Sequence, residues 1–338
     1  PDGYNRLVVA SDAVLFNHAG AGHQVKINKA AAGDTASLLF QTGFGGRAEL
    51  GTAGSDDFTF KVSADGSSWA EALRIEAATG RVTAPISGWR EMLTGPRTYY
   101  VDPLLGSDTR DGQTTGQGAF ATLDRAVTEV AHVDGSGHPV TVQLADGVYD
   151  LGAVPVGIMA PLGGGGIEII GNVTNPNAVT VTSSGAAMEL VTGRLKLRGV
   201  RLEMSGTEPT LRVLSGGVLE VDQVTFGTAG GHIDLVGGRL EGGGSYAIDG
   251  GGAYHLRLSQ GAVLGGGVQA LTLSNTPNFT TAFAICTMAG QADFSGHSFA
   301  GAATGRRFDV ATQGVIQSGG IVLPGDTAGS VQSGGIYV

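Results

Sequence analysis

The segment Gly216-Gly217-Val218-Leu219-Glu220-Val221-Asp222 joins a glycine turn to a short strand in which apolar and polar residues alternate. Similar segments recur from about residue 165 onward. Their aligned turn glycines are Gly193, Gly217, Gly238, Gly261, Gly290 and Gly314, so the steps between them are 24, 21, 23, 29 and 24 residues. A period of about 23 residues with very short strands predicts a parallel β-helix, in which each coil makes one circuit and glycine turns the corners.

A leucine-rich-repeat horseshoe has a similar period, but its Leu-x-x-Leu-x-Leu-x-x-Asn consensus is absent from this chain. We therefore expect an all-β protein whose residues 165–338 form the repeats and the C-terminal end of a right-handed parallel β-helix. A short amphipathic segment precedes the repeats, with Leu123, Ala126, Val127 and Val130 at helical spacing. This pattern predicts one helix, and residues 97–164 are expected to form the entry and cap of the β-helix.

The composition indicates a folded β protein. The 338 residues include 59 glycines, 41% are hydrophobic and only 15% are charged, and no apolar run approaches the ~18 residues of a membrane span. The net charge is −10 and there are four lysines, so binding driven by neutralisation of phosphates is not expected. We therefore expect neither nucleic-acid binding nor membrane insertion.

The cysteine and histidine content predicts no metal centre and no cofactor. Cys286 is the single cysteine, and the seven histidines show no His-Glu-x-x-His pattern. The chain begins at Pro1 without a signal-like segment, and we expect this boundary to lie inside a longer protein with a further N-terminal part.

The first 85 residues show a different pattern from the repeats. Short strands are predicted at residues 7–9, 25–27, 37–40, 58–62 and 72–75, separated by glycine-rich turns. In the fourth, Phe58, Phe60 and Val62 share one face, whereas Thr59 and Lys61 lie on the other. Residues 1–85 are therefore expected to form a small β domain with a thin core, followed by a linker over residues 86–96.

Two segments that frame residues 97–338 resemble a known family. The first comprises Thr98-Tyr99-Tyr100-Val101-Asp102-Pro103 and Val142-Gln143-Leu144-Ala145-Asp146-Gly147-Val148-Tyr149, and the second comprises Thr304-Gly305-Arg306-Arg307-Phe308-Asp309-Val310 and Leu323-Pro324-Gly325-Asp326. They resemble the entry segment and the recurrent ending of phage tail fibres and tailspikes with a pectate-lyase-like β-helix. In these fibres and tailspikes the entry helix closes the N-terminal end of the solenoid.

The N-terminal block resembles a domain of alphaproteobacterial prophage fibres and of gene transfer agent head spikes. The resemblance rests on Val14-Leu15-Phe16-Asn17-His18, Ala36-Ser37-Leu38-Leu39-Phe40-Gln41-Thr42-Gly43 and Asp56-Asp57-Phe58. It implies a homotrimer on the surface of a virion or phage-like particle, joined to a capsid or tail protein through its N-terminal part. It also implies attachment to a capsular or cell-surface polysaccharide. The segment Ala282-Phe283-Ala284-Ile285-Cys286-Thr287-Met288-Ala289 suits either a seam between copies or the lining of the coil interior.

When the coils are aligned on their turn glycines, charged residues occupy the same position in successive coils and form columns along the β-helix. One column holds Glu189, Arg212, Asp234 and Arg257, a second holds Lys196, Glu220 and Glu241, and Arg198 lies beside Asp222. Adjacent coils are about 4.8 Å apart, so these side chains are expected to be neighbours. The favoured interpretation is a charge ladder that keeps the coils in register. A sugar-binding face is an alternative, and a depolymerase site that uses Glu220 and Glu241 is another.

The remaining candidates are aspartates and aromatic residues. Asp102, Asp108 and Asp111 lie in a polar loop and are interpreted as turn-forming residues, with calcium binding as the weaker alternative. Aromatic faces bind sugars, and the candidates for this role include Trp89, Tyr246 and Tyr254. The two tyrosines lie in glycine-rich turns, where we expect them to be exposed. Tyr99 and Tyr100 alternate across a strand, so at least one of them is expected to be buried.

These observations predict a receptor-binding spike that adheres to surface polysaccharide without cleaving it. A depolymerase tailspike on the same scaffold is the first alternative, and a purely structural spacer is the second. The sugar-binding candidates for the adhesive function are Tyr246, Tyr254, Trp89, Arg212, Asp234 and Arg257.

Overall fold

The computed structural model describes residues 7–84, 90–185, 188–265 and 267–338. The chain divides into two compact units, residues 1–89 and residues 90–338, and each is described by itself. The fold is all-β, with 46% of the residues in strands and 5% in helices. In the described part of the chain no helix is long and apolar enough to cross a membrane.

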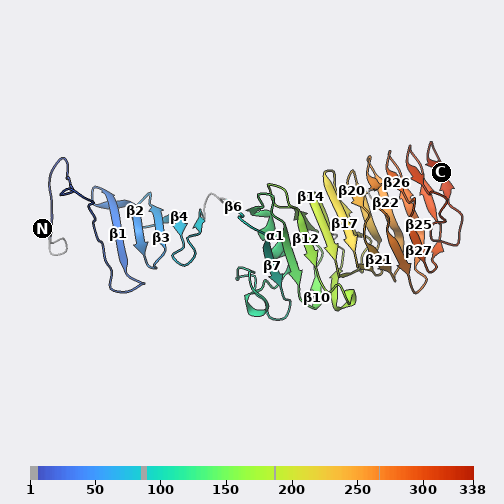
Figure 1. Ribbon diagram of the computed structural model, residues 1–338, viewed down its shortest axis with the longest axis horizontal. Helices are drawn as coiled ribbons and strands as arrows, with labels where there is room; N and C mark the ends of the chain where they lie inside the picture. Colours follow the sequence, from blue (N-terminus) through green and yellow to red (C-terminus); the bar gives the residue numbers. More distant parts are fainter. Residues whose placement is uncertain (1–6, 85–89, 186–187, 266) are drawn as a thin grey trace. The chain divides into compact units, whose positions relative to one another are not determined.

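The first unit is a single antiparallel sheet of five strands in the order β1 to β5, and β1 to β4 lie side by side in Figure 1. The strands are β1 (Thr35–Thr42), β2 (Gly45–Ala53), β3 (Phe58–Val62), β4 (Ala70–Ile75) and β5 (Val82–Thr83). The strands predicted at residues 37–40, 58–62 and 72–75 are thus confirmed. The strands predicted at residues 7–9 and 25–27 are wrong, because neither segment pairs with a neighbouring strand in the described chain.

The second unit is a parallel β-solenoid of about 8 turns, which confirms the predicted repeat architecture. Its strands form three parallel stacks that run along the solenoid, and in Figure 1 successive coils follow one another from green to red. Over residues 140–300 each coil contributes strand residues to all three stacks. The residues at one level of the third stack, Glu189, Arg212, Asp234 and Arg257, are each paired with the next, at steps of 23, 22 and 23 residues.

The three stacks are defined by their strands. The first stack contains β10 (Gly147–Asp150), β13 (Val179–Ser183), β15 (Arg201–Met204), β18 (Thr225–Phe226), β21 (Ser245–Ile248), β24 (Ala270–Leu273) and β27 (Ser298–Ala300). The second contains β7 (Arg97–Val101), β9 (Val140–Leu144), β12 (Ile167–Ile170), β14 (Met188–Arg198), β17 (Gly217–Asp222), β20 (Arg239–Glu241), β23 (Val263–Gly265), β26 (Gln291–Asp293), β30 (Val315–Gln317) and β32 (Ile336–Tyr337). The third contains β11 (Val156–Met159), the first part of β14, β16 (Pro209–Val213), β19 (Gly231–Val236), β22 (Gly252–Ser259), β25 (Asn278–Cys286), β28 (Thr304–Gly305), β29 (Phe308–Val310) and β31 (Ser330–Val331).

Alternating side chains from all three stacks fill the interior of the solenoid. In β17, for example, Leu219 and Val221 are buried, whereas Glu220 and Asp222 face outward. Glycines turn the corners, as at Gly193, whose φ of 87° lies in the left-handed region and whose missing Cβ leaves room for Ala160. Burial of the apolar positions drives this fold, and the corners turn the chain from one stack to the next.

The predicted helix is present as α1 (Leu123–Ala131), and its four predicted apolar residues are all buried. Thr122 caps its N-terminus by accepting a hydrogen bond from the Arg125 N–H at 3.2 Å. The helix packs on β7, β9 and β11, and its apolar residues belong to the solenoid core. Its role in closing the end of the solenoid stays a prediction. A short parallel pair, β6 (Glu91–Met92) with β8 (Val133–Asp134), lies in the same region.

The apolar segment 282–289 mainly lines the coil interior. Ala282, Phe283, Ala284 and Cys286 are buried within a single chain, so they are covered without any contribution from a second copy. The thiol of Cys286 lies 3.3 Å from the carbonyl oxygen of Val315, and burial raises its pKa to about 11. Of the two alternatives for this segment, the structure therefore favours the interior lining over the seam between copies.

Candidate functional site

The outer surface of the third stack carries a continuous ladder of charged residues. Arg257 donates two hydrogen bonds to the carboxylate of Asp234, from Nε at 2.8 Å and from its terminal nitrogen at 2.5 Å. Arg212 approaches the same carboxylate from the neighbouring coil at 3.6 Å and pairs with Glu208 at 2.7 Å and with Glu189 at 3.5 Å. The alternating column predicted from the sequence is therefore confirmed as a set of paired neighbours, to which the structure adds Glu208.

Asp234 is the buried centre of this ladder, because its side chain is only 2% exposed. A carboxylate at such a position is stabilised by the two guanidinium groups that flank it. The outer ends remain accessible, with 39% of the Arg257 side chain and 45% of the Glu208 side chain exposed. The ladder thus presents fixed guanidinium donors and carboxylate acceptors to the solvent, and these groups can bind hydroxyl groups.

Tyr254 belongs to the same surface but is not exposed as predicted. The Arg257 guanidinium lies over its ring at 4.6 Å, and a Cβ on Gly231 would overlap the ring from the neighbouring coil. Only 6% of Tyr254 is exposed, and burial raises the pKa of its hydroxyl to about 12. The expectation of an exposed sugar-stacking face is wrong here, because Gly231 in the neighbouring coil makes room for the ring to be covered.

The second stack carries the column of Lys196, Glu220 and Glu241, and its register is also confirmed. Both glutamates bind one guanidinium, that of Arg194, which lies at 2.7 Å from Glu241 and also contacts Glu220. Arg194 is absent from the column predicted from the sequence, although it precedes Lys196 by two residues and therefore shares its face of the strand.

The contact of Arg194 with Glu220 and Glu241 affects whether these two glutamates can act as the catalytic pair of a depolymerase. Its hydrogen bond lowers the pKa of Glu241, and Arg239 lies at 3.1 Å from the same carboxylate. A general acid in glycoside hydrolysis needs a raised pKa, so this environment is opposite to the one required. Next to this column, Arg198 pairs with Asp222 at 3.1 Å, as the register predicted.

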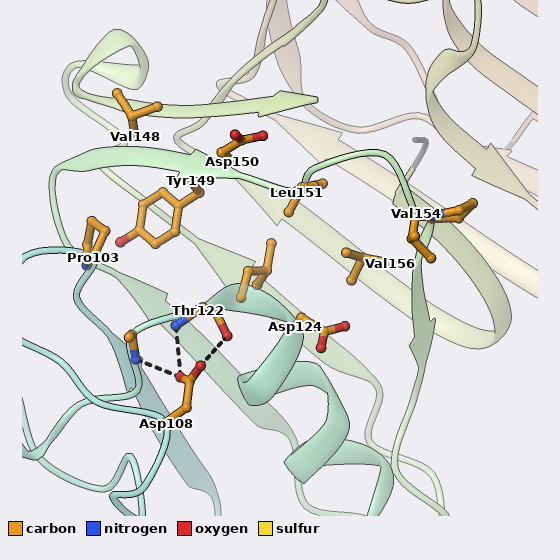
Figure 2. A pocket seen from close by; sticks show the side chains of 13 residues that line it. Pro103, Asp108, Thr122, Asp124, Val148, Tyr149, Asp150, Leu151, Val154 and Val156 are labelled. Atoms are coloured by element: carbon orange, nitrogen blue, oxygen red, sulfur yellow. Dashed lines mark hydrogen bonds between the residues drawn. The ribbon is translucent and has the colours of Figure 1, made fainter. Parts of the chain in front are cut away.

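The three loop aspartates each accept backbone hydrogen bonds. Asp102 accepts from the N–H groups of Leu104 and Leu105, and Asp111 accepts from that of Gln113. Asp108 accepts from the N–H of Ala121 and from both the N–H and the hydroxyl of Thr122, as the dashed lines in Figure 2 show. No group of three or more potential metal ligands occurs among the described residues. These contacts support the favoured interpretation of turn-forming residues, and Asp108 also holds the start of α1.

A hollow of about 500 Å³ lies between the start of α1, β10 and the segment that leads into β11 (Figure 2). Its rim includes the exposed side chains of Val148 and Val154. Three aspartates, Asp108, Asp124 and Asp150, also line it, and no basic residue does. The volume of this hollow is in the range of small-ligand sites. The carboxylate of Asp108, however, already accepts the hydrogen bonds from Ala121 and Thr122.

Tyr246 lies in the interior of the solenoid, so its expected exposure is also wrong. It is 6% exposed, and its hydroxyl lies 2.8 Å from Nε2 of His255. Nδ1 of His255 lies 3.0 Å from Nδ1 of His232, whose Nε2 lies 2.9 Å from the carbonyl oxygen of Gly227. No sequence motif marks these histidines, because they show no His-Glu-x-x-His pattern, and alternation places both on the outward face of their strands.

The hydrogen-bond partners assign every proton of this buried network. The Gly227 carbonyl only accepts, so His232 is protonated on Nε2 and accepts on Nδ1. His255 therefore donates from Nδ1 and accepts on Nε2, which makes the Tyr246 hydroxyl a donor. Burial lowers the pKa of both imidazoles, to about 4 for His232, and raises that of Tyr246. The network is thus neutral and fully paired, as a buried polar cluster requires.

Arg212, Asp234 and Arg257 are therefore brought together with Tyr254, whereas Tyr246 is separated from them in the interior. Trp89 lies outside the described residues. Tyr99 is buried and Tyr100 is half-buried, as their alternation predicted. Comparison of the chain with models of protein families, with curated proteins and with solved structures found no match.

Proposed function

We propose that this chain is the receptor-binding spike of a phage-like particle, of the type carried by gene transfer agents, and that it adheres to capsular or cell-surface polysaccharide without cleaving it. The observation that carries the proposal is the ladder of Glu208, Arg212, Asp234 and Arg257 on the third stack. The ladder repeats charged side chains from one coil to the next, about 4.8 Å apart. A polymer with repeating hydroxyl groups can be bound by such a repeating array.

The rigidity of the ladder supports adhesion. Asp234 is buried and holds Arg257 through two hydrogen bonds, so the guanidinium is already ordered before a ligand arrives. An ordered binding group loses little conformational entropy on binding, which increases affinity. The planar guanidinium of Arg257 then offers its exposed edge to neighbouring hydroxyl groups.

The assembly is proposed on the sequence resemblance. The spike is a homotrimer on the surface of the virion or phage-like particle, and a part near its N-terminus connects it to a capsid or tail protein. The antiparallel sheet of the first unit, distinct from the parallel solenoid, suits this division between a connecting part and a binding part.

The test uses capsular polysaccharide purified from alphaproteobacterial cells and the full chain. Binding is measured by biolayer interferometry, and reducing ends are followed in the same samples. We expect binding without release of reducing ends, and an affinity at least tenfold weaker for Arg257→Gln. The matched control is Arg194→Gln on the second stack, which should bind like the unmodified chain.

Other outcomes would overturn the proposal. Release of oligosaccharides would indicate a depolymerase, and loss of that activity in Glu220→Gln/Glu241→Gln would locate it on the second stack. Failure to bind any of the polysaccharides would favour a structural spacer. Equal loss of binding in both arginine variants would contradict the assignment to the third stack.

A further inference from the structure

One face of the sheet of the first unit is apolar except for Thr52, which lies between Ala36 and Phe58. In its central row Leu38 pairs with Leu50, Leu50 with Phe60, and Phe60 with Leu73, so these four side chains point to the same side. The flanking rows add Phe40 and Val62, which both pair with Ala48, and Phe58, which pairs with Ile75. We call the set Leu38, Phe40, Leu50, Phe58, Phe60, Val62, Leu73 and Ile75 the apolar N-terminal face.

The opposite side of the same sheet is mostly polar, and Leu39 is the large apolar residue that lies beside Glu49 on it. It carries Glu49, Lys61 and Glu71 in one row, and Thr59 and Arg74 in the next. Arg74 pairs there with Glu71 at 2.7 Å and with Asp57 at 3.1 Å. The sheet is therefore amphipathic, with all its charged strand residues on one side and none on the apolar N-terminal face.

No second layer covers the apolar N-terminal face in the described chain. Leu38, Phe40, Phe58, Phe60 and Val62 remain between 36% and 53% exposed. A sheet normally buries its apolar side against another layer, and monomers seldom expose contiguous apolar patches beyond a few hundred Å². From typical side-chain areas, the face exposes roughly 500 Å² per chain.

We infer that the apolar N-terminal face is the surface through which this chain packs against a second copy of itself. Three such faces, meeting around the axis of the proposed homotrimer, would together bury about 1,500 Å² in total, an area of the size found in specific association. The face carries no charge, so copies that each have a net charge of −10 do not repel one another there. A single-layered sheet buries its apolar side against a further layer, and the identical face of another copy can supply that layer.

The inference relies on the proposed homotrimer for the number of copies, and it is independent of carbohydrate binding. Its test uses the full chain, in which Cys286 is the single cysteine and is buried. Phe60→Cys places a thiol at the centre of the apolar N-terminal face. Lys61→Cys is the matched control, because the adjacent residue of the same strand points to the polar side.

The unmodified chain is first examined by native mass spectrometry, and we expect an oligomer. Under mild oxidation at 1 and 10 μM protein, Phe60→Cys should form a disulfide between chains to the same extent at both concentrations. The Lys61→Cys variant should form at least tenfold less of the disulfide between chains. Phe60→Glu should dissociate the first units, seen as a loss of protection of β3 amides in hydrogen exchange.

The outcomes separate this inference from the proposed function. An oligomer in which Phe60→Cys does not cross-link, or in which Lys61→Cys cross-links equally, would overturn the inference and leave the assembly and the adhesion intact. A monomer in which β3 is nevertheless protected would mean that another part of the same chain covers the face, and would overturn the inference together with the homotrimer.

Discussion

His255 donates its Nδ1–H to Nδ1 of His232 at 3.0 Å, inside a solenoid whose surrounding side chains are aromatic or aliphatic. Phe226 stacks on His232 with a centroid distance of 5.3 Å, and Phe283 stacks on His255 at 5.0 Å. The pair is held in one tautomeric state by Gly227 at one end and Tyr246 at the other. The stability of the solenoid should therefore depend on the neutrality of this pair.

Acidification should destabilise the protein between pH 6.5 and about 4. Above pH 6.5 both imidazoles are neutral in the folded and the unfolded chain. Below it the unfolded chain binds protons that folded His232, with its pKa of about 4, does not bind. Each such histidine lowers the free energy of unfolding by roughly 1.4 kcal/mol per pH unit, or roughly 3 kcal/mol over the interval for His232.

Urea unfolding at pH 7.5, 6.5, 5.5 and 5.0 measures how steeply the free energy of unfolding falls as the pH is lowered. This slope is measured at pH values above those at which most carboxylates become protonated. His255→Gln keeps one donor and one acceptor but removes one titrating group, and because burial also lowers the pKa of His297, the slope should fall to about two thirds. An unchanged slope in His255→Gln would contradict the assignment of the pH dependence to this pair.

Loss of the hydroxyl of Tyr246 should also destabilise the solenoid. Tyr246→Phe leaves Nε2 of His255 buried without a donor, at a cost of about 1–3 kcal/mol in the free energy of unfolding. Tyr100→Phe is the matched control, because no side-chain hydrogen bond of Tyr100 is lost, and its effect should stay below about 0.5 kcal/mol. The comparison is made by urea unfolding at pH 7.5. Equal effects of the two changes would show that the Tyr246 hydroxyl does not hold the network.

Removal of the carboxylate charge of Asp234 should disrupt the ladder on the third stack. Asp234→Asn leaves the guanidinium groups of Arg212 and Arg257 without their shared anion, and we expect a loss of about 2 kcal/mol. Asp222→Asn on the second stack removes a more exposed ion pair with Arg198 and should cost under about 1 kcal/mol. The midpoint of urea unfolding at pH 7.5 distinguishes them, and a larger effect for Asp222→Asn would contradict the burial argument.

A methyl group at Gly231 should displace Tyr254. Its Cβ would overlap the tyrosine ring, so Gly231→Ala is expected to cost about 1–3 kcal/mol and to disturb the contact between Tyr254 and Arg257. At Gly157 the nearest atom to an added Cβ is 3.8 Å away, so Gly157→Ala should change the free energy of unfolding by under about 0.5 kcal/mol. Tyrosine fluorescence and thermal unfolding follow both effects, and a neutral Gly231→Ala would show that the ring can move without loss.

The repeat and its charged columns could be predicted from the sequence because strand alternation and the glycine period are local properties of the chain. Glu189, Arg212, Asp234 and Arg257 need only their spacing to be placed in one column. The same rule failed for His232 and His255, which alternation places on the outward face although both are buried. In β22 the pairing register shifts between Gly252 and Tyr254, just before His255, and such an irregularity interrupts strict alternation.

The sequence by itself thus determined the parallel solenoid, the single helix, the amphipathic strand of the first unit and the order of charges along the coils. These features follow from the period of apolar residues and from the backbone freedom of glycine. Only the tertiary structure decided that Tyr246 completes a histidine network, that Tyr254 is covered by Arg257, and that Arg194 binds both glutamates of the second stack. Such contacts join side chains from different coils, and their partners are set by how the corners bend and how the interior packs, which no local pattern encodes.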